Sequence, residues 1–438
     1  MPLRESAGER HSRPLTATSS FIVPGTSPAS SSGLVRSASF TSSASGLVRS
    51  ASFSSFHSHA TTEAGQEPYY PEGSSKYALR DTRVAIDFSL PAESGAVPLA
   101  YSAQKSLLYF TRGNRVQYKS LITADAVSQL CKLPDMLGDL TLLAAGDAAL
   151  IALASSTGAI QLWDAGAKKL VCGWTTKGAV SMAWSGPVLS VGGPKGAVRH
   201  YDTRVQPAAK MREQAAKVTR HQTRVAAMAW NTDGKLLASG DGSGAVYCWD
   251  ARSNRVPLDV GEFVQRRKKI QHAGAVSALA WCPWQPKLLA TGDVLGTVKL
   301  WTIDAASPHS NASVPGKLVL PGGVVALHFA PHYKELLSAV GSAPPATSTA
   351  PVVPGVSNAV ATHALPSLRP IARTAVSVAG SQQGTGSSAE PHAVTGAVLA
   401  GHKIVLAVPG EGKLKVFEVW GKRREVRRQA SFLGNSIR

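Results

Sequence analysis

Short stretches of alternating apolar and polar residues, separated by glycine-rich turns, recur along most of the chain. One unit is clear in the middle: residues 276–281 alternate with a period of two, and two further strand patterns follow at 287–292 and 297–301. Such alternation predicts β-strands rather than helices. Two prolines within 282–286 are incompatible with a helix or a central strand, so we predict a loop there. Three short strands with glycine turns and a closing tryptophan are typical of a propeller blade.

The unit just before this one repeats the same plan. Equivalent residues lie 51 or 52 positions apart, and the pairs are His221 with His272, Trp230 with Trp281, and Trp249 with Trp301. A blade needs about 40 to 45 residues, so we assign the excess to a loop at 251–270. A repeat of this length indicates that each unit buries its faces against its neighbours.

Seven such units predict an all-β fold, a seven-bladed WD-repeat β-propeller. The blades are expected at 97–121, 140–164, 180–205, 221–250, 271–301, 324–373 and 393–420. The propeller domain would span 76–420, with low-complexity loops near 341–356 and 379–390. Residues 1–75 are rich in Ser, Ala, Thr and Gly and are predicted to be disordered, and 421–438 form a short basic C-terminal tail. A closed ring has no exposed sheet edges and usually serves as a docking platform.

Charge and cysteine content limit the kinds of partner and the redox compartment that the protein can have. The net charge is +19, and the basic excess lies at 204–220, 266–269 and 422–438. Such patches can hold nucleic acid, an acidic membrane or an acidic protein, or can be solvated surface or nuclear-import signals. We predict a protein partner, with no nucleic acid and no membrane, because no apolar run reaches about 18 residues and no signal peptide is evident. The four cysteines form no C-x-x-C pair and are expected to be buried thiols in a reducing compartment.

No catalytic or metal-binding constellation stands out, so we predict that the protein is not an enzyme and needs no cofactor. The sequence contains neither G-x-S-x-G nor H-E-x-x-H. His221 and His272 precede the inner strands of their blades, where we expect buried structural donors. The turns expected to supply their acidic partners hold Ser243 and Leu295 instead, so we expect both polar networks to be incomplete. The tryptophans expected to pack in the core are Trp184, Trp230 and Trp281.

The two terminal regions share a short basic motif. R-S-A-S-F occurs twice near the N-terminus, and R-R-Q-A-S-F occurs once in the C-terminal tail. In each copy an arginine lies three residues before a serine, a spacing that suits kinases with an acidic substrate groove. We therefore predict phosphorylation at Ser39, Ser52 and Ser431, where the added negative charge would change how the tails dock. Chance matches in low-complexity sequence remain the alternative.

Five short motifs stand out along the chain: A-W-C-P-W-Q at 280–285, P-H-Y-K-E-L at 331–336, Y-D-T-R-V at 201–205, D-F-S-L at 87–90, and the C-terminal pair Ile437 and Arg438. Together they resemble motifs of the Fizzy family, the WD-repeat activators of the anaphase-promoting complex (cyclosome). The A-W-C-P-W-Q motif is highly specific to this family, because generic propellers lack it. The resemblance covers about 76–438, and its motifs come in the family's order.

The resemblance implies an adaptor rather than an enzyme. Ile437 and Arg438 would bind scaffold subunits of the complex, because a terminal carboxylate, a guanidinium and an apolar plug make a compact anchor. The family's destruction-box groove lies between the first and seventh blades, and Asp87 and Glu411 are the candidates for its carboxylates. The implied partners are destruction-motif substrates such as cyclins, together with checkpoint inhibitors. The expected location is the nucleus and the cytoplasm.

The sequence also departs from the family. The N-terminal anchor motif has no complete match, and the Asn and Gln of the family's lysine–Glu–Asn receptor are absent from 292–296 and 338–342. These departures are consistent with a divergent or specialised member of the family, for example a meiotic one. The main alternative is a general WD-repeat scaffold that does not activate a ligase, and a propeller enzyme is a third. The C-terminal pair Ile437 and Arg438 and the destruction-box groove distinguish the adaptor from the general scaffold, because a general scaffold needs none of them.

Overall fold

The structure is a computed structural model whose described residues form β-strands, the turns that connect them and a few short helical segments. It describes residues 80–87, 97–123, 125–146, 149–253, 256–264, 267–303, 316–341, 358–376 and 393–420. Both terminal regions, and nearly all of the two predicted low-complexity loops, lie outside these residues. Within them, no helix is long and apolar enough to cross a membrane.

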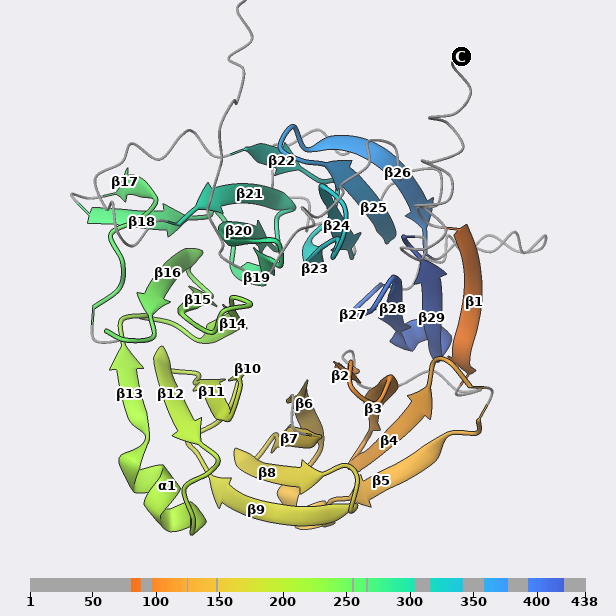
Figure 1. Cartoon of the computed structure of the whole chain (residues 1–438), viewed down its shortest axis with the longest axis vertical. Helices are drawn as coiled ribbons and strands as arrows, with labels where there is room; N and C mark the ends of the chain where they lie inside the picture. Colours follow the sequence, from red (N-terminus) through yellow and green to blue (C-terminus); the bar gives the residue numbers. More distant parts are fainter. Residues whose placement is uncertain are drawn as a thin grey trace, which may run out of the picture. The chain divides into compact units, whose positions relative to one another are not determined.

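The described strands form seven antiparallel sheets in a ring, as Figure 1 shows. The first sheet contains β2 (Leu99–Ser102), β3 (Leu107–Arg112), β4 (Arg115–Ser120) and β5 (Ser128–Lys132). The second contains β6 (Leu140–Ala145), β7 (Leu150–Ser155), β8 (Ala159–Asp164) and β9 (Lys169–Thr175). The third contains β10 (Ser181–Ser185), β11 (Val188–Gly192), β12 (Ala197–Asp202) and β13 (Ala216–Thr219).

The remaining sheets follow the same plan, with one addition and one exchange. The fourth contains β14 (Val225–Trp230), β15 (Leu236–Asp241), β16 (Ala245–Asp250), β18 (Arg267–Gln271) and an extra strand β17 (Glu262–Val264). The fifth contains β19 (Val276–Cys282), β20 (Gln285–Asp293), β21 (Thr297–Thr302) and β22 (Lys317–Val319). The sixth contains β23 (Val324–Phe329), β24 (Glu335–Val340), β25 (Ala359–Ala364) and β26 (Arg369–Ala375). The seventh contains β27 (Gly396–Ala400), β28 (Lys403–Val408), β29 (Lys413–Glu418) and β1 (Arg80–Asp87).

Short helical segments lie in three of the connections between strands. They are η2 (Asp135–Leu137), α1 (Ala208–Gln214) and η3 (Pro409–Glu411). The helix α1 links β12 to β13 and packs against β9 and β12, with the side chain of Met211 buried between the second and third sheets. The seven-bladed fold predicted from the sequence is confirmed.

The ring is closed by a strand from the beginning of the described chain. β1 is the outer strand of the seventh sheet and pairs antiparallel with β29 from Arg80↔Glu418 to Asp87↔Lys413. In addition, β2 of the first sheet contacts both β6 and β27. The segment that ends at Asp87 lies before the predicted first blade at 97–121, and in the structure it completes the seventh sheet. The reason is that β29 would otherwise present an unpaired edge.

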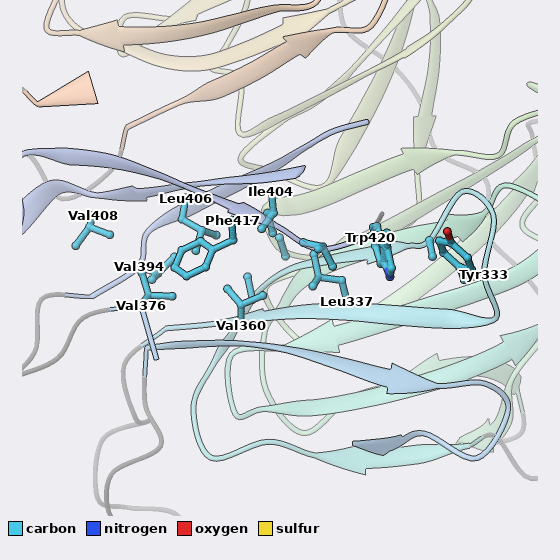
Figure 2. Close-up of a cluster of buried hydrophobic side chains, with 14 residues drawn as sticks. Tyr333, Leu337, Val360, Val376, Val394, Ile404, Leu406, Val408, Phe417 and Trp420 are labelled. Carbon is cyan, nitrogen blue, oxygen red and sulfur yellow. The ribbon is translucent and has the colours of Figure 1, made fainter. Parts of the chain in front are cut away.

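Apolar side chains fill the seams between neighbouring sheets. Between the sixth and seventh sheets, Leu337, Val360, Phe417 and Trp420 lie in one buried cluster, as Figure 2 shows. Successive side chains along each strand of this seam point to opposite faces of the sheet, so one set faces each neighbouring sheet. On β28, for example, Ile404 and its even-numbered neighbours face the sixth sheet, whereas Val405 belongs to the cluster shared with the first sheet.

Tryptophan side chains also join neighbouring sheets through hydrogen bonds. The indole Nε1 donors and their acceptors in the preceding sheet are Trp184 to Ala144 O (3.1 Å), Trp230 to Ser190 Oγ (3.0 Å) and Trp281 to Ala229 O (2.9 Å). The expected packing role of these three residues is therefore confirmed, and each also satisfies its polar atom. A buried indole N–H without a partner would cost about 1–3 kcal/mol, so these bonds fix the relative orientation of the sheets.

Two local expectations were wrong. The predicted loop at 282–286 is a two-residue hairpin, because Cys282 pairs with Gln285 and Pro286 lies in β20. Pro286 is tolerated because the ladder between β20 and β21 begins only at Leu288. The predicted loop at 251–270 contains two strands, of which β18 supplies the outer strand that pairs with β16.

The closure makes a prediction about truncation. A chain that lacks residues 1–87 should lose cooperative thermal unfolding and aggregate, because removing β1 exposes the edge of β29 and one side of the adjoining apolar cluster. A chain that lacks only residues 1–75 is the matched control and should melt at the temperature of the full chain. Circular dichroism melts and size-exclusion chromatography measure both properties. Equal behaviour of the two truncated chains would contradict a structural role for β1.

Candidate functional site

The fourth sheet contains a complete buried polar network around His221. Its Nδ1 lies 2.8 Å from Asp241 Oδ2, and its Nε2 lies 2.8 Å from Ser239 Oγ. The same Ser239 hydroxyl accepts a hydrogen bond from Trp249 Nε1 at 2.8 Å. Asp241 Oδ1 also accepts bonds from the backbone N–H of Ala245 and from Ser243. The side chains of His221 and Asp241 are only 1% and 2% exposed, so the network is structural.

The fifth sheet repeats this network with Thr in place of Ser. His272 Nδ1 lies 3.1 Å from Asp293 Oδ2, and its Nε2 lies 2.7 Å from Thr291 Oγ1. Trp301 Nε1 donates to that hydroxyl at 3.1 Å. The structural role expected for His272 is therefore confirmed, as it is for the equivalent residue of the fourth sheet.

The expectation that both networks lack their acid was wrong. The acid does not come from the turn at the position of Leu295; it is the last residue of the preceding strand, Asp241 in β15 and Asp293 in β20. The signal was present in the sequence, because the hydroxyl residue and the acid are two positions apart and so share one face of the strand.

Both buried carboxyl groups have pKa values below their usual range. Burial by itself would raise the pKa of Asp293, but hydrogen bonds from His272 and from the backbone N–H groups of Thr297 and Leu295 more than offset it. The same balance lowers the pKa of Asp241, with His221 as the main donor. Because the folded-state pKa is the lower one, the stabilisation is present above pH ~4 and is lost as the pH falls further.

A variant of this arrangement occurs in the sixth sheet. His363 of β25 stands opposite Leu336, and it occupies the position that Trp301 occupies in the fifth sheet. Its Nε2 lies 2.9 Å from Ser338 Oγ. The residue is 2% exposed. Burial lowers the pKa of His363 to about 4, although a bond to the Leu368 backbone opposes this shift.

The cysteines and the remaining acids form no reactive cluster among the described residues. No group of three His, Cys, Asp or Glu side chains there could hold a metal ion. Cys131, Cys248 and Cys282 are buried free thiols, and burial raises the pKa of each to about 12. Cys172 is half-buried, and burial raises its pKa as well. Thiols with such pKa values are protonated at neutral pH and are poor nucleophiles.

The structure places both predicted groove carboxylates on the seventh sheet. Asp87 is the last residue of β1 and is exposed, and it stands directly opposite Lys413 of β29. Glu411 lies in η3, two residues before Lys413. Two residues separated by more than three hundred positions in sequence therefore come to the same end of one sheet.

The two carboxylates have different surroundings. Both oxygens of Glu411 lie near Lys415 Nζ, at 3.0 and 2.8 Å, and the two side chains are 18% and 14% exposed. Lys415 Nζ also donates to Val376 O at 2.7 Å, so this ion pair lies at the seam between the sixth and seventh sheets. Asp87 lies on the strand beside the first sheet. The assignment of both residues to a destruction-motif groove stays a prediction.

Sequence reasoning did not identify the apolar side chains on the other side of this strand. Lys119 of β4 donates from Nζ to Ala85 O at 3.0 Å, which joins the first sheet to β1. Near this contact Val84 is 49% exposed, and Ile122, which follows the buried Leu121, is 78% exposed. We call Val84, Asp87, Lys119 and Ile122 the rim of the first and seventh sheets. It includes one exposed carboxylate and two exposed apolar side chains.

The remaining predicted site residues lie outside the described part of the chain. These are the anchor pair Ile437 and Arg438 and the phosphorylation candidates Ser39, Ser52 and Ser431. Their roles stay predictions.

The ring and its two complete networks define the class of protein, a WD-repeat propeller. The family described as "WD domain, G-beta repeat" matches residues 212–250 and 264–302, which cover most of the fourth and fifth sheets. The solved structure "Crystal Structure of Mitotic Checkpoint Complex" contains a similar chain, with a TM-score of 0.60 and 20% identity, covering 82% of this chain and 98% of that one. At this identity the likeness shows the fold.

Several curated relatives are similar to part of this chain. "WD repeat-containing protein slp1" of Schizosaccharomyces pombe is 34% identical over 163 residues, 36% of this chain and 29% of that protein. "Cell division cycle 20.5, cofactor of APC complex" of Arabidopsis thaliana is 30% identical over 196 residues, 44% of this chain and 41% of that protein. "Anaphase-promoting complex subunit cdc20" of Dictyostelium discoideum is 30% identical over 199 residues, 44% of this chain and 36% of that protein. The resemblance to the Fizzy family is confirmed, and the matches span less than half the length of these relatives.

The buried His363 predicts a pH dependence of stability. Its pKa is about 4 in the folded protein and about 6.5 in the unfolded chain. The free energy of unfolding therefore decreases by up to about 3 kcal/mol as the pH falls from about 6.5 to about 4. Replacing His363 with Phe should remove this part of the dependence while lowering stability at neutral pH. Urea unfolding at several pH values across that window measures it. An identical pH profile for the two proteins would show that His363 does not titrate in this way.

The different surroundings of the two carboxylates predict different effects on stability. Glu411→Ala should lower the free energy of unfolding by about 1.5–3 kcal/mol, because it leaves the half-buried ammonium of Lys415 without its carboxylate. Asp87→Ala is the matched control on the exposed side and should change it by no more than about 0.5 kcal/mol. Chemical denaturation measures both. A larger loss for Asp87→Ala would contradict this assignment.

Proposed function

We propose that the protein is a substrate-recognition adaptor and activator of the anaphase-promoting complex ubiquitin ligase. In this function it recruits cell-cycle proteins through their destruction motifs for ubiquitination and degradation. The observation that carries the proposal is the similarity of the propeller to relatives named as a cofactor and a subunit of that complex. Because those matches cover less than half of each relative, the activity, substrates and partners all belong to the proposal.

The rim of the first and seventh sheets has the chemistry that such a motif requires. A destruction box offers an arginine and a leucine to its receptor. The exposed carboxylate of Asp87 suits the guanidinium, because charge-assisted hydrogen bonds are the stronger ones. The exposed side chains of Val84 and Ile122 suit the leucine. Glu411 is held by Lys415, so its contribution would be to position the turn of η3 or to share its charge with a ligand arginine.

The C-terminal pair Ile437 and Arg438 would hold the adaptor on a scaffold subunit of the complex. The partners that follow are those scaffold subunits, destruction-motif substrates such as cyclins, and checkpoint inhibitors. We place this activity in the nucleus and the cytoplasm. The protein would act by binding rather than catalysis, because its buried histidines are committed to structural hydrogen bonds and its thiols are protonated.

The proposal is tested by capture of the ligase. The full chain and a version lacking Ile437 and Arg438 are used to pull down the anaphase-promoting complex from a mitotic extract. We expect the full chain to retain the complex and the truncated chain to lose most of it, because the apolar side chain of Ile437 and the guanidinium of Arg438 are removed together. Immunoblots for the scaffold subunits measure retention.

A control separates loss of the anchor from loss of the fold. The two proteins should have the same melting temperature, since the truncated residues lie outside the seven sheets. Replacing Arg438 with Lys keeps the charge and the carboxylate but not the planar fork, and should give intermediate retention. If neither the full chain nor its variants recover any subunit, the activator function is wrong and a general WD-repeat scaffold becomes the better description.

A further inference from the structure

One edge of the ring carries a continuous row of turns over the third, fourth and fifth sheets. In an antiparallel four-stranded sheet, the turn between the second and third strands leaves from the same edge as the connection to the next sheet. These turns and connections are the segments 176–180, 193–196, 220–224, 241–244, 272–275 and 293–296, which we call the turn strip. All of their residues are described by the structure.

Close approaches between glycines and neighbouring turns show that the strip is continuous. A Cβ added to Gly196 would collide with the backbone oxygen of His221, on the connection into the fourth sheet, and one on Gly244 would collide with the backbone oxygen of His272, on the connection into the fifth. Further along, a Cβ on Gly274 would lie 2.7 Å from Leu295 Cγ. Each turn therefore packs directly against the next. The glycines also keep the floor of the strip low, because side chains there would strike the neighbouring backbone.

Cations occupy one end of the turn strip. Lys177 and Lys195 lie at the third sheet, and Arg220 and Arg224 lie on the connection into the fourth; all four are exposed. The strip contains two acids, Asp241 and Asp293, but both are buried and bonded to histidines. No described carboxylate forms an ion pair with any of the four cations. This end of the strip therefore presents positive charge to solvent.

Apolar side chains occupy the other end. Val294, in the turn of the fifth sheet, is 43% exposed, and Leu295 beside it is half-buried against Gly274. The turn is held by hydrogen bonds of Asp293 and of the backbone, in which the side chain of Val294 takes no part. The strip therefore carries basic side chains over the third and fourth sheets and the apolar side chains of Val294 and Leu295 over the fifth.

This pattern fits an acidic protein segment better than a nucleic acid. Single-stranded nucleic acids are bound by basic grooves that also contain aromatic platforms for the bases, and the turn strip has no Phe, Tyr or Trp. Its histidines are buried and engaged. Basic side chains at one end of the strip and apolar side chains at the other instead match a peptide that has carboxylates at one end and an apolar side chain at the other. The charges would set the orientation of the peptide.

We propose that the turn strip is a docking site for an extended acidic segment of a partner protein. The carboxylates of the segment contact Lys195, Arg220 and Arg224, and an apolar side chain of the segment rests on Val294 and Leu295. The strip and its residues are separate from the rim and the C-terminal pair, so the proposal does not depend on the ligase function.

Binding of a synthetic peptide tests the proposal. The probe is a fluorescein-labelled peptide with a run of glutamates followed by a short spacer and a leucine, titrated with the full chain at low ionic strength and followed by fluorescence anisotropy. We expect saturable binding that weakens with added salt. Arg220→Glu with Arg224→Glu should weaken it by about tenfold or more. Val294→Ser should weaken binding of this peptide but not of a version in which the leucine is alanine.

A control with the same change in net charge tests whether the site is specific. Lys317→Glu with Arg369→Glu reverses two exposed cations on the outer strands of the fifth and sixth sheets, and it should leave the affinity unchanged. The melting temperature of each variant shows that the fold is retained. An oligothymidylate of the same total charge is titrated in parallel.

Three results would overturn the proposal. One is a failure of the wild-type chain to bind the peptide at low salt. Another is an equal loss of affinity in both double variants, which would indicate a non-specific effect of net charge. The third is tighter binding of the oligothymidylate than of the peptide, with the same dependence on Arg220 and Arg224, which would assign the strip to nucleic acid instead. A selective loss in Arg220→Glu with Arg224→Glu, together with the leucine-dependent effect of Val294→Ser, supports it.

Discussion

The pairing of β1 with β29 is the interaction on which the other six sheets depend. Each sheet has apolar side chains on both faces, so each is stable only between two neighbours. A linear row of sheets would leave one face of the first and one face of the last in water. Completing the seventh sheet with β1 anchors the start of the propeller to its end, and Lys119 of the neighbouring β4 then bonds to the backbone of Ala85.

The polar groups inside the ring have the same function as the apolar seams, which is to fix how one strand or sheet lies against another. The indoles of Trp184, Trp230 and Trp281 reach acceptors in the preceding sheet. The networks around His221 and His272 connect the start of a sheet to its second and third strands. A buried histidine surrounded by hydrogen-bond partners in this way is not available for catalysis.

The sequence predicted the number of sheets and their order because the inner strands carry a strong signal. They are apolar on both faces and end in glycine turns, and a tryptophan recurs at a fixed position. The outer strands carry a weak signal, since β9 and β13 are largely exposed and read as loops. The position of β1 could not be found from local pattern at all, because its partner lies at the far end of the propeller. The acids of the two networks were missed because Asp241 and Asp293 end strands, whereas the search considered turns.

The candidate site was predictable only as far as the resemblance extended. Motif matching placed Asp87 and Glu411 near one groove, and the fold brings both to one end of the seventh sheet. It could not show that Lys415 neutralises Glu411, or that Val84 and Ile122 are exposed beside the contact between Lys119 and Ala85. Those facts depend on which face of a strand is covered, and in a propeller the cover comes from a neighbouring sheet. A surface that combines an exposed carboxylate, exposed apolar side chains and a paired carboxylate from both ends of the chain exists only when the ring is closed. The closure of the ring therefore also creates this surface.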